Sequence, residues 1–383
     1  MSSKISHLLR EHEKYRSRGL NLIASENYLS PLVREALASD LAGRYHSEWY
    51  GGTCYSREII AATEELARAL FKVNHAIVTP LSGNICDLTA LFSYTSPGDT
   101  VAMLPFSVGG YPFGLERFHR KRVEIPADPA SFEIDVNGTL ESIIKKNVKL
   151  VILGSSFLLF PQPVREICRS IGELDQSVHC VYDGSHVLGL IASGEFQDPI
   201  REGVEVLFGS THKTFYGPQG GIMLTDSQDL SKRLRALHDI DTDNGIGLVD
   251  NVHMNRIAAL GLSMEEMVSD QDYGRRVIKN AKALASVLYE MGLPVRFREK
   301  GFTESHQILL NLTEKTAAEF CHNLENSGIF IDIGGRIGAA ELTHRGMGIS
   351  EMDEIGGLLA EVYNSGPDEN IKKKVRELAD RFN

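Results

Sequence analysis

Cysteine is scarce in this sequence, and its spacing is irregular. The chain of 383 residues has five cysteines, an odd number, scattered from Cys54 to Cys321. Metal sites and disulfide frameworks use cysteines at short, recurring spacings, so the sequence predicts neither. We expect all five cysteines to be reduced, as is usual in cytoplasmic proteins.

The sequence also lacks a long apolar run, a basic run and an internal repeat. No stretch is long enough to cross a bilayer, and residues 1–17 are too polar for a signal peptide. Asp and Glu number 51 against 40 Lys and Arg, which gives a formal net charge of −11 and disfavours nucleic acid as a partner. We therefore expect a soluble, cytoplasmic protein with neither a membrane nor a nucleic acid as partner.

Two short apolar runs, each followed by polar residues, organise the chain. The run 178–182 is followed by Asp183, and the run 204–208 is followed closely by Lys213. Both runs are typical of buried strands. Because the carboxyl ends of strands in an open α/β sheet face the ligand crevice, we expect Asp183 and Lys213 to converge on one ligand.

An acid and a lysine in this arrangement suit pyridoxal phosphate. This cofactor needs a lysine for its Schiff base and a carboxylate that keeps its ring nitrogen protonated. The alternative is that Asp183 caps a turn and Lys213 is a solvated surface lysine. The glycine-rich segment 217–221, which follows Lys213, favours the functional interpretation, because a plain surface loop has little reason to be so constrained.

An anion site is predicted earlier in the chain. A strand that begins near Ala76 runs into Ser82-Gly83-Asn84, and a helix continues to Tyr94. Unpaired N–H groups at the start of a helix, together with its dipole, attract anions. We assign this turn to the cofactor phosphate.

Strands and helices alternate along most of the sequence. Such alternation predicts an α/β fold with a mostly parallel sheet flanked by helices. We expect residues 220–224 to form a strand that runs antiparallel to its neighbour. A long helical stretch over about 253–292 should then lead into a smaller α+β domain, with strands near 307–312 and 329–333. The predicted division is an N-terminal helix and arm at 1–50, a large cofactor domain at 51–262 and a small domain at 263–383.

Several motifs resemble the serine hydroxymethyltransferase family, a group of fold-type I pyridoxal-phosphate enzymes similar to aspartate aminotransferase. They occur in the family's order: LIASENYLSP at 22–31, DGSH at 183–186, STHKT at 210–214 and GPQGG at 217–221. The resemblance covers most of the chain. It implies a homodimer with shared active sites, or a tetramer, that acts on a small amino acid.

The resemblance also implies roles for individual residues. The implied catalytic residues are Lys213, Asp183, His186, His212, Tyr45 and Glu48. The implied cofactor-binding residues are Ser82, Gly83, Asn84, Tyr111, Ser156, Asp183, His186, Ser210, Lys213 and Gly247. The implied substrate-binding residues are Ser25, Tyr50 and Arg336, the last as a two-pronged clamp on the substrate carboxylate.

Plainer interpretations of some of these residues stay open. Ser25 could be a turn serine, Glu48 an exposed loop acid and Tyr111 a core aromatic. His186 could be a structural histidine and Arg336 a surface arginine.

The chain departs from the family at several of these positions. Tyr111 stands in place of a histidine that stacks on the cofactor ring, and Gln219 in place of an arginine, which removes a positive charge near the cofactor. The tyrosine-rich loop 44–52 is shortened, and so is the loop before Arg336. Both loops lie on the folate side in the family, so we expect a damaged or missing folate pocket.

These observations lead to one main hypothesis and three alternatives. The main hypothesis is a pyridoxal-phosphate enzyme that makes or breaks the Cα–Cβ bond of a serine- or threonine-like amino acid, with glycine as product or acceptor and without tetrahydrofolate. The first alternative is a folate-dependent glycine hydroxymethyltransferase. The second is an enzyme acting at Cα, an aminotransferase or racemase, and the third is a non-catalytic protein that binds pyridoxal phosphate or an amino acid.

Overall fold

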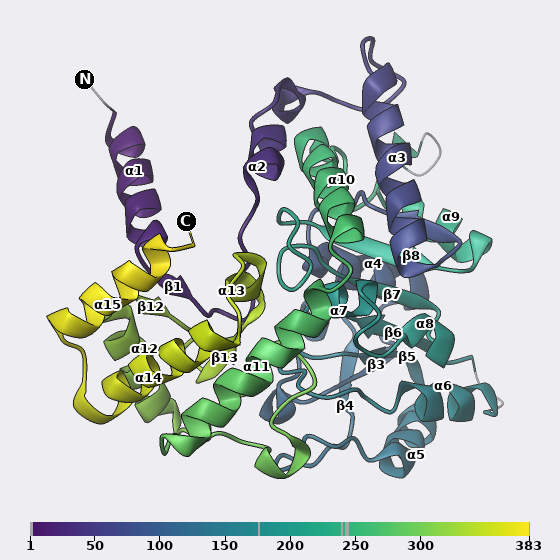
Figure 1. Ribbon diagram of the computed structural model, residues 1–383. Coiled ribbons are helices and arrows are strands. Elements are labelled where there is room, and N and C mark those ends of the chain that lie inside the picture. The colour runs from purple at the N-terminus through teal and green to yellow at the C-terminus, as the bar shows by residue number, and fades with distance from the viewer. Residues whose placement is uncertain (1–2, 175–176, 239, 242–244, 383) are drawn as a thin grey trace. The chain divides into compact units, whose positions relative to one another are not determined.

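Contacts within the chain define two compact units. A computed structural model describes residues 3–174, 177–238, 240–241 and 245–382 (Figure 1). One unit comprises residues 29–271, and the other comprises 1–28 together with 272–383. The predicted domains end at other residues, 50 and 262, and stay a prediction.

The unit 29–271 is built on a seven-stranded sheet with the order β2-β8-β7-β6-β5-β3-β4. Its strands are β2 (His75–Ile77), β3 (Thr100–Met103), β4 (Lys121–Glu124), β5 (Val148–Leu153), β6 (His179–Asp183), β7 (Val206–Ser210) and β8 (Gly221–Thr225). Neighbours from β4 to β7 run parallel, while β8 is antiparallel to both β7 and β2. The mostly parallel sheet and the antiparallel return at 220–224 are therefore confirmed.

Helices cover this sheet, as Figure 1 shows. They are α2 (Pro31–Leu37), α3 (Cys54–Phe71), α4 (Gly83–Tyr94), α5 (Val136–Lys146), α6 (Val164–Gly172), α7 (Leu188–Ala192), α8 (Pro199–Glu202), α9 (Gln228–Arg235) and α10 (Met254–Ser269). Short elements complete the unit: η1 (Asp40–Gly43), η2 (Phe106–Val108), η3 (Leu115–Phe118), β9 (Ile240–Asp241) and β10 (Gly245–Ile246). The central strands β5 to β8 are almost wholly buried, which explains their continuous apolar sequence.

Serine side chains cap two of these helices. The Ser30 hydroxyl accepts a hydrogen bond from the N–H of Val33, with Pro31 at the first helical position of α2. Ser82 caps α4 in the same way. The predicted continuous helical stretch 253–292 is wrong, because α10 ends at Ser269 and a new helix begins only at Tyr273, after a short polar segment.

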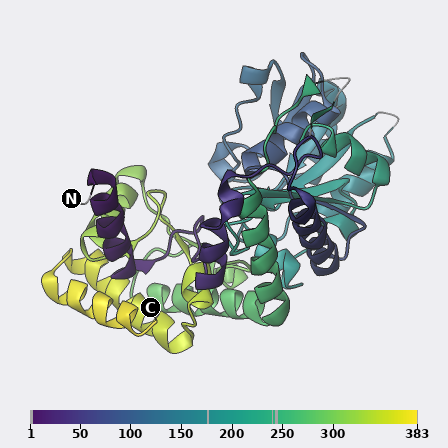
Figure 2. The same cartoon turned by 90° about the horizontal axis from the view of Figure 1, so that it is seen from above.

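The second unit has its own core. Its helices are α1 (Lys4–Ser17), α11 (Tyr273–Glu290), α12 (Glu314–Asn326), α13 (Ala340–His344), α14 (Ile349–Ser365) and α15 (Glu369–Asp380), with the short turn η4 (Arg298–Lys300). β1 (Leu20–Asn21) pairs in parallel with β12 (Ile329–Phe330), and β11 (Gln307–Leu309) pairs antiparallel with β13 (Arg336–Gly338). In Figures 1 and 2 the N-terminal helix α1 lies beside the C-terminal helix α15.

The helices of the described residues are too short or too polar to cross a membrane.

Candidate active site

The predicted acid and lysine follow neighbouring strands. β6 and β7 pair in parallel, with Asp183 opposite Phe208, so both strands end at the same edge of the sheet. Lys213 lies three residues past the end of β7, and its Nζ donates to Ser210 Oγ at 3.3 Å. The predicted convergence of the Asp183 and Lys213 segments is therefore present.

The start of α4 meets the same edge. A Cβ atom on Gly83 would lie 2.3 Å from Ser210 Oγ and 3.1 Å from Ser185 Oγ, so only glycine permits this approach. Ser82 Oγ accepts from the N–H of Ile85 at 3.2 Å and caps the helix. The predicted phosphate turn, Ser210 and Lys213 are thus neighbours, as an anion site built on this helix start requires.

Close contacts surround the segment that carries Asp183. Asp183 Oδ1 accepts from the N–H of Ser185 at 2.9 Å, and Ser185 Oγ accepts from the N–H of Ser210 at 2.9 Å. Gly154 has φ +93°, and a Cβ on it would lie 2.0 Å from the Asp183 carbonyl oxygen. The N–H of Ser185 therefore orients the carboxylate, and the end of β5 closely approaches the Asp183 backbone.

Tyr111 and Ser156 come from adjacent loops. The Tyr111 hydroxyl donates to Asn84 Oδ1 at 3.3 Å, which places this ring beside the α4 start. Burial, and then the charges of Asp87 and Asp183, raise the pKa of Tyr111. The Ser156 N–H donates to the carbonyl of Gly109 at 2.8 Å, two residues before Tyr111.

Two predicted histidines flank the lysine and the acid. His186 is buried, and its carbonyl accepts from the Thr214 hydroxyl at 2.8 Å, which ties the Asp183 segment to the Lys213 segment. Burial, and secondly Lys213, lower the pKa of His212 to about 4. Its Nδ1 atom is buried and has no hydrogen-bond partner among the described residues. His212 is therefore neutral at physiological pH.

Asp87 is a site residue that the sequence analysis missed. It lies on α4 one turn after Gly83, so it shares the helix face that meets Ser210. The side chain is 2% exposed, and within the described chain Oδ1 has no hydrogen-bond partner. Burial, and secondly Asp183, raise the pKa of Asp87, while Lys213 lowers it. A charged residue inside the apolar stretch 85–92 was the available signal.

The tyrosine-rich segment lies in the same unit. The Tyr45 and Tyr50 rings stack, with centroids 4.5 Å apart, and both are partly exposed. Glu48 forms an ion pair with Arg57 and is largely exposed. Gly247 is exposed, and the nearby residues 242–244 lie outside the described residues. The roles of these residues stay predictions.

The predicted substrate-binding residues Ser25 and Arg336 belong to the second unit. Arg336, on β13, is 8% exposed, and its Nε donates to Asp332 Oδ2 at 2.7 Å. The Gly338 N–H donates to the Leu22 carbonyl at 2.8 Å, so the segment leading to Ser25 runs beside the strand of Arg336. Arg336 is thus a buried, oriented fork rather than a surface arginine.

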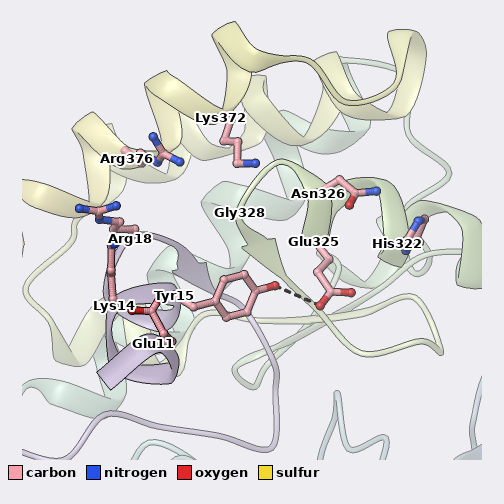
Figure 3. A pocket seen from close by; sticks show the side chains of 10 residues that line it. All are labelled: Glu11, Lys14, Tyr15, Arg18, His322, Glu325, Asn326, Gly328, Lys372 and Arg376. Carbon is pink, nitrogen blue, oxygen red and sulfur yellow. Dashed lines mark hydrogen bonds between the residues drawn. The ribbon is translucent and has the colours of Figure 1, made fainter. Parts of the chain in front are cut away.

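A pocket of about 510 Å³ lies elsewhere in the second unit, among α1, α12 and α15 (Figure 3). Lys14, Arg18, Lys372 and Arg376 face it, together with Glu325, whose carboxylate accepts from the Tyr15 hydroxyl at 3.0 Å. None of the predicted site residues lines this pocket. It is therefore not the candidate active site.

Sequence comparison gives the family of the chain. A family model described as serine hydroxymethyltransferase matches residues 1–359. A serine hydroxymethyltransferase of Methanobrevibacter smithii is 37% identical over 406 residues, which cover 98% of this chain and 93% of the relative. The one of Methanopyrus kandleri is 40% identical over 401 residues, which cover 97% and 91%.

Structural comparison agrees. An L-threonine transaldolase from Pseudomonas fluorescens superposes with a TM-score of 0.89 at 27% identity, over 99% of this chain and 91% of that protein. The predicted fold class, fold-type I, is confirmed, and so is a pyridoxal-phosphate-dependent enzyme that makes or breaks the Cα–Cβ bond of a serine- or threonine-like amino acid. The chain belongs to the serine hydroxymethyltransferase family.

Proposed function

We propose that the protein cleaves and forms the Cα–Cβ bond of a small β-hydroxy amino acid with pyridoxal phosphate on Lys213 and without tetrahydrofolate. The observation that carries the proposal is the convergence of Lys213, Ser210 and the Ser82-Gly83 turn at the strand end beside Asp183. The resemblance of the fold to an L-threonine transaldolase supports the reaction class.

The residues at this edge fit the cofactor. The missing Cβ of Gly83 lets the Ser210 hydroxyl lie against the α4 start, so that a hydroxyl donor and the helix start would face the same phosphate. Pyridoxal phosphate, when bound, withdraws electrons from the Cα of the amino acid. We assign Lys213 to the covalent attachment and Ser82, Gly83, Asn84 and Ser210 to the phosphate.

Residues around the cofactor ring would set its charge and orientation. We assign Asp183 to the ring nitrogen, whose proton a carboxylate stabilises. Tyr111 supplies an aromatic face beside Asn84, and His186, His212 and Ser156 complete the surroundings. Because His212 is neutral at physiological pH, it adds no second positive charge beside Lys213.

Arg336 and Ser25 would bind the amino acid. A planar guanidinium donates two parallel hydrogen bonds to a carboxylate, and Asp332 already fixes the orientation of the Arg336 fork. Tyr50, with Tyr45 stacked on it, is assigned to the substrate side chain.

Independence from folate rests on two short segments. Only residues 331–335 separate β12 from β13, and the tyrosine-rich loop 44–52 is shortened. The carboxylate of Glu48, one of the implied catalytic residues, is paired with Arg57. The second candidate, a folate-dependent hydroxymethyltransferase, is favoured by the names of the relatives.

We further propose a cytoplasmic homodimer with shared active sites. Large apolar side chains on α1 are exposed in the single chain: Ile5 by 73%, Leu8 by 51% and Leu9 by 57%. Burial of such side chains against a second copy is favourable. The free cysteines support a reducing compartment. Sedimentation at the mass of one chain, 42.3 kDa, would contradict the dimer.

An absorbance titration tests the cofactor assignment. Pyridoxal phosphate added to the purified protein should give a visible band that Lys213→Ala lacks and that the surface variant Lys232→Ala keeps. Glycine should then change this band equally with and without tetrahydrofolate. A band that persists in Lys213→Ala would refute the attachment site, and a glycine response that requires tetrahydrofolate would favour the second candidate.

A further inference from the structure

Arg256, on α10, is a buried cation without an anionic partner in the described chain. The side chain is 5% exposed. No described carboxylate forms an ion pair with it, and Cys86 is the group whose charge would stabilise it. Burial lowers the pKa of Arg256 to about 10, so the guanidinium is still charged at neutral pH. A buried charge of this kind is costly unless something neutralises it.

The guanidinium is fixed on one side only. Its Nη2 donates to the carbonyls of Val78 at 2.8 Å, Val252 at 3.2 Å and Thr79 at 3.4 Å. Nε and Nη1 are buried and have no hydrogen-bond partner among the described residues. Three carbonyl contacts at most account for one nitrogen, and they leave the positive charge itself uncompensated.

Arg256 lies against the segment in which the sequence departs from the family. A Cβ on Gly220 would lie 2.6 Å from Arg256 Nη1, and Gly220 follows Gln219, where the family has arginine. A Cβ on the next residue, Gly221, would lie 2.5 Å from the carbonyl oxygen of Ser82. The guanidinium therefore adjoins both segments that meet at the proposed phosphate turn.

We propose that Arg256 is a positioning residue. From α10 it supplies to the phosphate end of the cofactor site a positive charge that is absent at position 219, where this chain has glutamine and the family has arginine. This inference rests on the proposed function. The cation acts through its field, because its unpartnered atoms are buried behind the turn, and charges interact strongly where water is excluded. An anionic phosphate at the α4 start offsets the cost of burying Arg256.

The experiment compares two ligands that differ only in the phosphate. Dissociation constants of pyridoxal phosphate and of pyridoxal are measured by absorbance for the wild type, Arg256→Gln, Arg256→Lys and the double variant Arg256→Gln with Gln219→Arg. Arg256→Gln should weaken pyridoxal phosphate about tenfold or more and change pyridoxal less than about twofold. Arg256→Lys should stay within about threefold of the wild type, and Gln219→Arg should restore most of the loss.

The matched control is Arg235→Gln, which removes a guanidinium that Glu64 already neutralises at 2.7 Å. It should leave both constants unchanged. Equal weakening of the two ligands in Arg256→Gln, or failure of both Arg256→Lys and the double variant to bind better than it, would overturn the inference in favour of a purely structural arginine. If Arg256→Gln does not fold, Arg256→Lys decides. It should bind pyridoxal phosphate within about threefold of the wild type, and a larger weakening that is equal for pyridoxal phosphate and pyridoxal would overturn the inference. Failure of the wild type to bind pyridoxal phosphate would instead remove the proposed function and the inference together.

Discussion

At the scale of single residues, the candidate site holds more ionisable groups than the reaction needs. Asp183 is proposed to face the cofactor ring, and Asp87 lies nearby, where burial first and the Asp183 charge second raise its pKa. Two like charges in a buried site cannot both be ionised at low cost. We infer that Asp87 is the neutral member of this pair.

The substitution Asp87→Asn tests this assignment through stability. The pKa of Asp87 is raised in the folded state, so its stabilising contribution is complete below the pKa of an unfolded aspartate and is lost as the pH rises through the folded value. Asparagine cannot ionise and escapes this loss. We compare the free energies of unfolding of the variant and the wild type, both without cofactor. Their difference should shift in favour of the variant by about 1 kcal/mol or more from pH 5 to pH 8.

Urea unfolding at the two pH values measures this difference. Asp229→Asn, an exposed change on α9, is the control and should show no such trend. An effect of Asp87→Asn that is equal at pH 5 and pH 8 would mean that Asp87 is ionised in the folded protein.

At the scale of elements, the strands that carry the site could be predicted from the sequence, and several contacts between them could not. The buried strands β6 and β7 appear in the sequence as continuous apolar runs, and the start of α4 appears as Ser82 before a helical pattern. These signals are local. The approach of Arg256 to Gly220 joins α10 to the end of the β7–β8 connection, and such a pairing depends on tertiary packing.

Other differences have similar causes. Asp87 was missed because the pattern of α4 otherwise indicates a buried structural helix. The helix prediction over 253–292 failed because helical periodicity continues on both sides of the polar break at 270–272. The predicted strands at 307–312 and 329–333 are shorter in the structure, since their pairing with β13 and β1 extends over only three and two residues.

Gly154 links β5 to the proposed acid and gives an element-scale prediction. The change Gly154→Ala places a Cβ 2.0 Å from the Asp183 carbonyl at φ +93°. We expect a loss of about 3 kcal/mol or more in the free energy of unfolding, because strain adds to a backbone clash. Displacement of Asp183 should also weaken pyridoxal phosphate binding severalfold.

Gly194→Ala is the matched control for this change. Gly194 also has a positive φ, +73°, but a Cβ there would meet nothing within 4 Å. It should cost only about 1 kcal/mol and leave cofactor affinity unchanged. Equal effects of the two alanines on stability and affinity would show that contact with Asp183 is unimportant.

At the scale of the whole molecule, the proposed roles are divided between the two units. The proposed cofactor residues all belong to 29–271, while Ser25 and Arg336 belong to the other unit. Both groups of residues are present, whereas the segments assigned to the folate side are short. The residues proposed to bind the cofactor and the amino acid are thus retained, and the reaction proposed for them proceeds without folate.

The most direct test is glycine formation from L-threonine and L-serine by the purified protein loaded with pyridoxal phosphate, with and without tetrahydrofolate. Our account predicts glycine and the matching aldehyde in equal amounts without tetrahydrofolate, a rate that folate changes less than about twofold, and no product with Lys213→Ala. Glycine that appears only when tetrahydrofolate is present, or a keto acid in place of glycine, would contradict it.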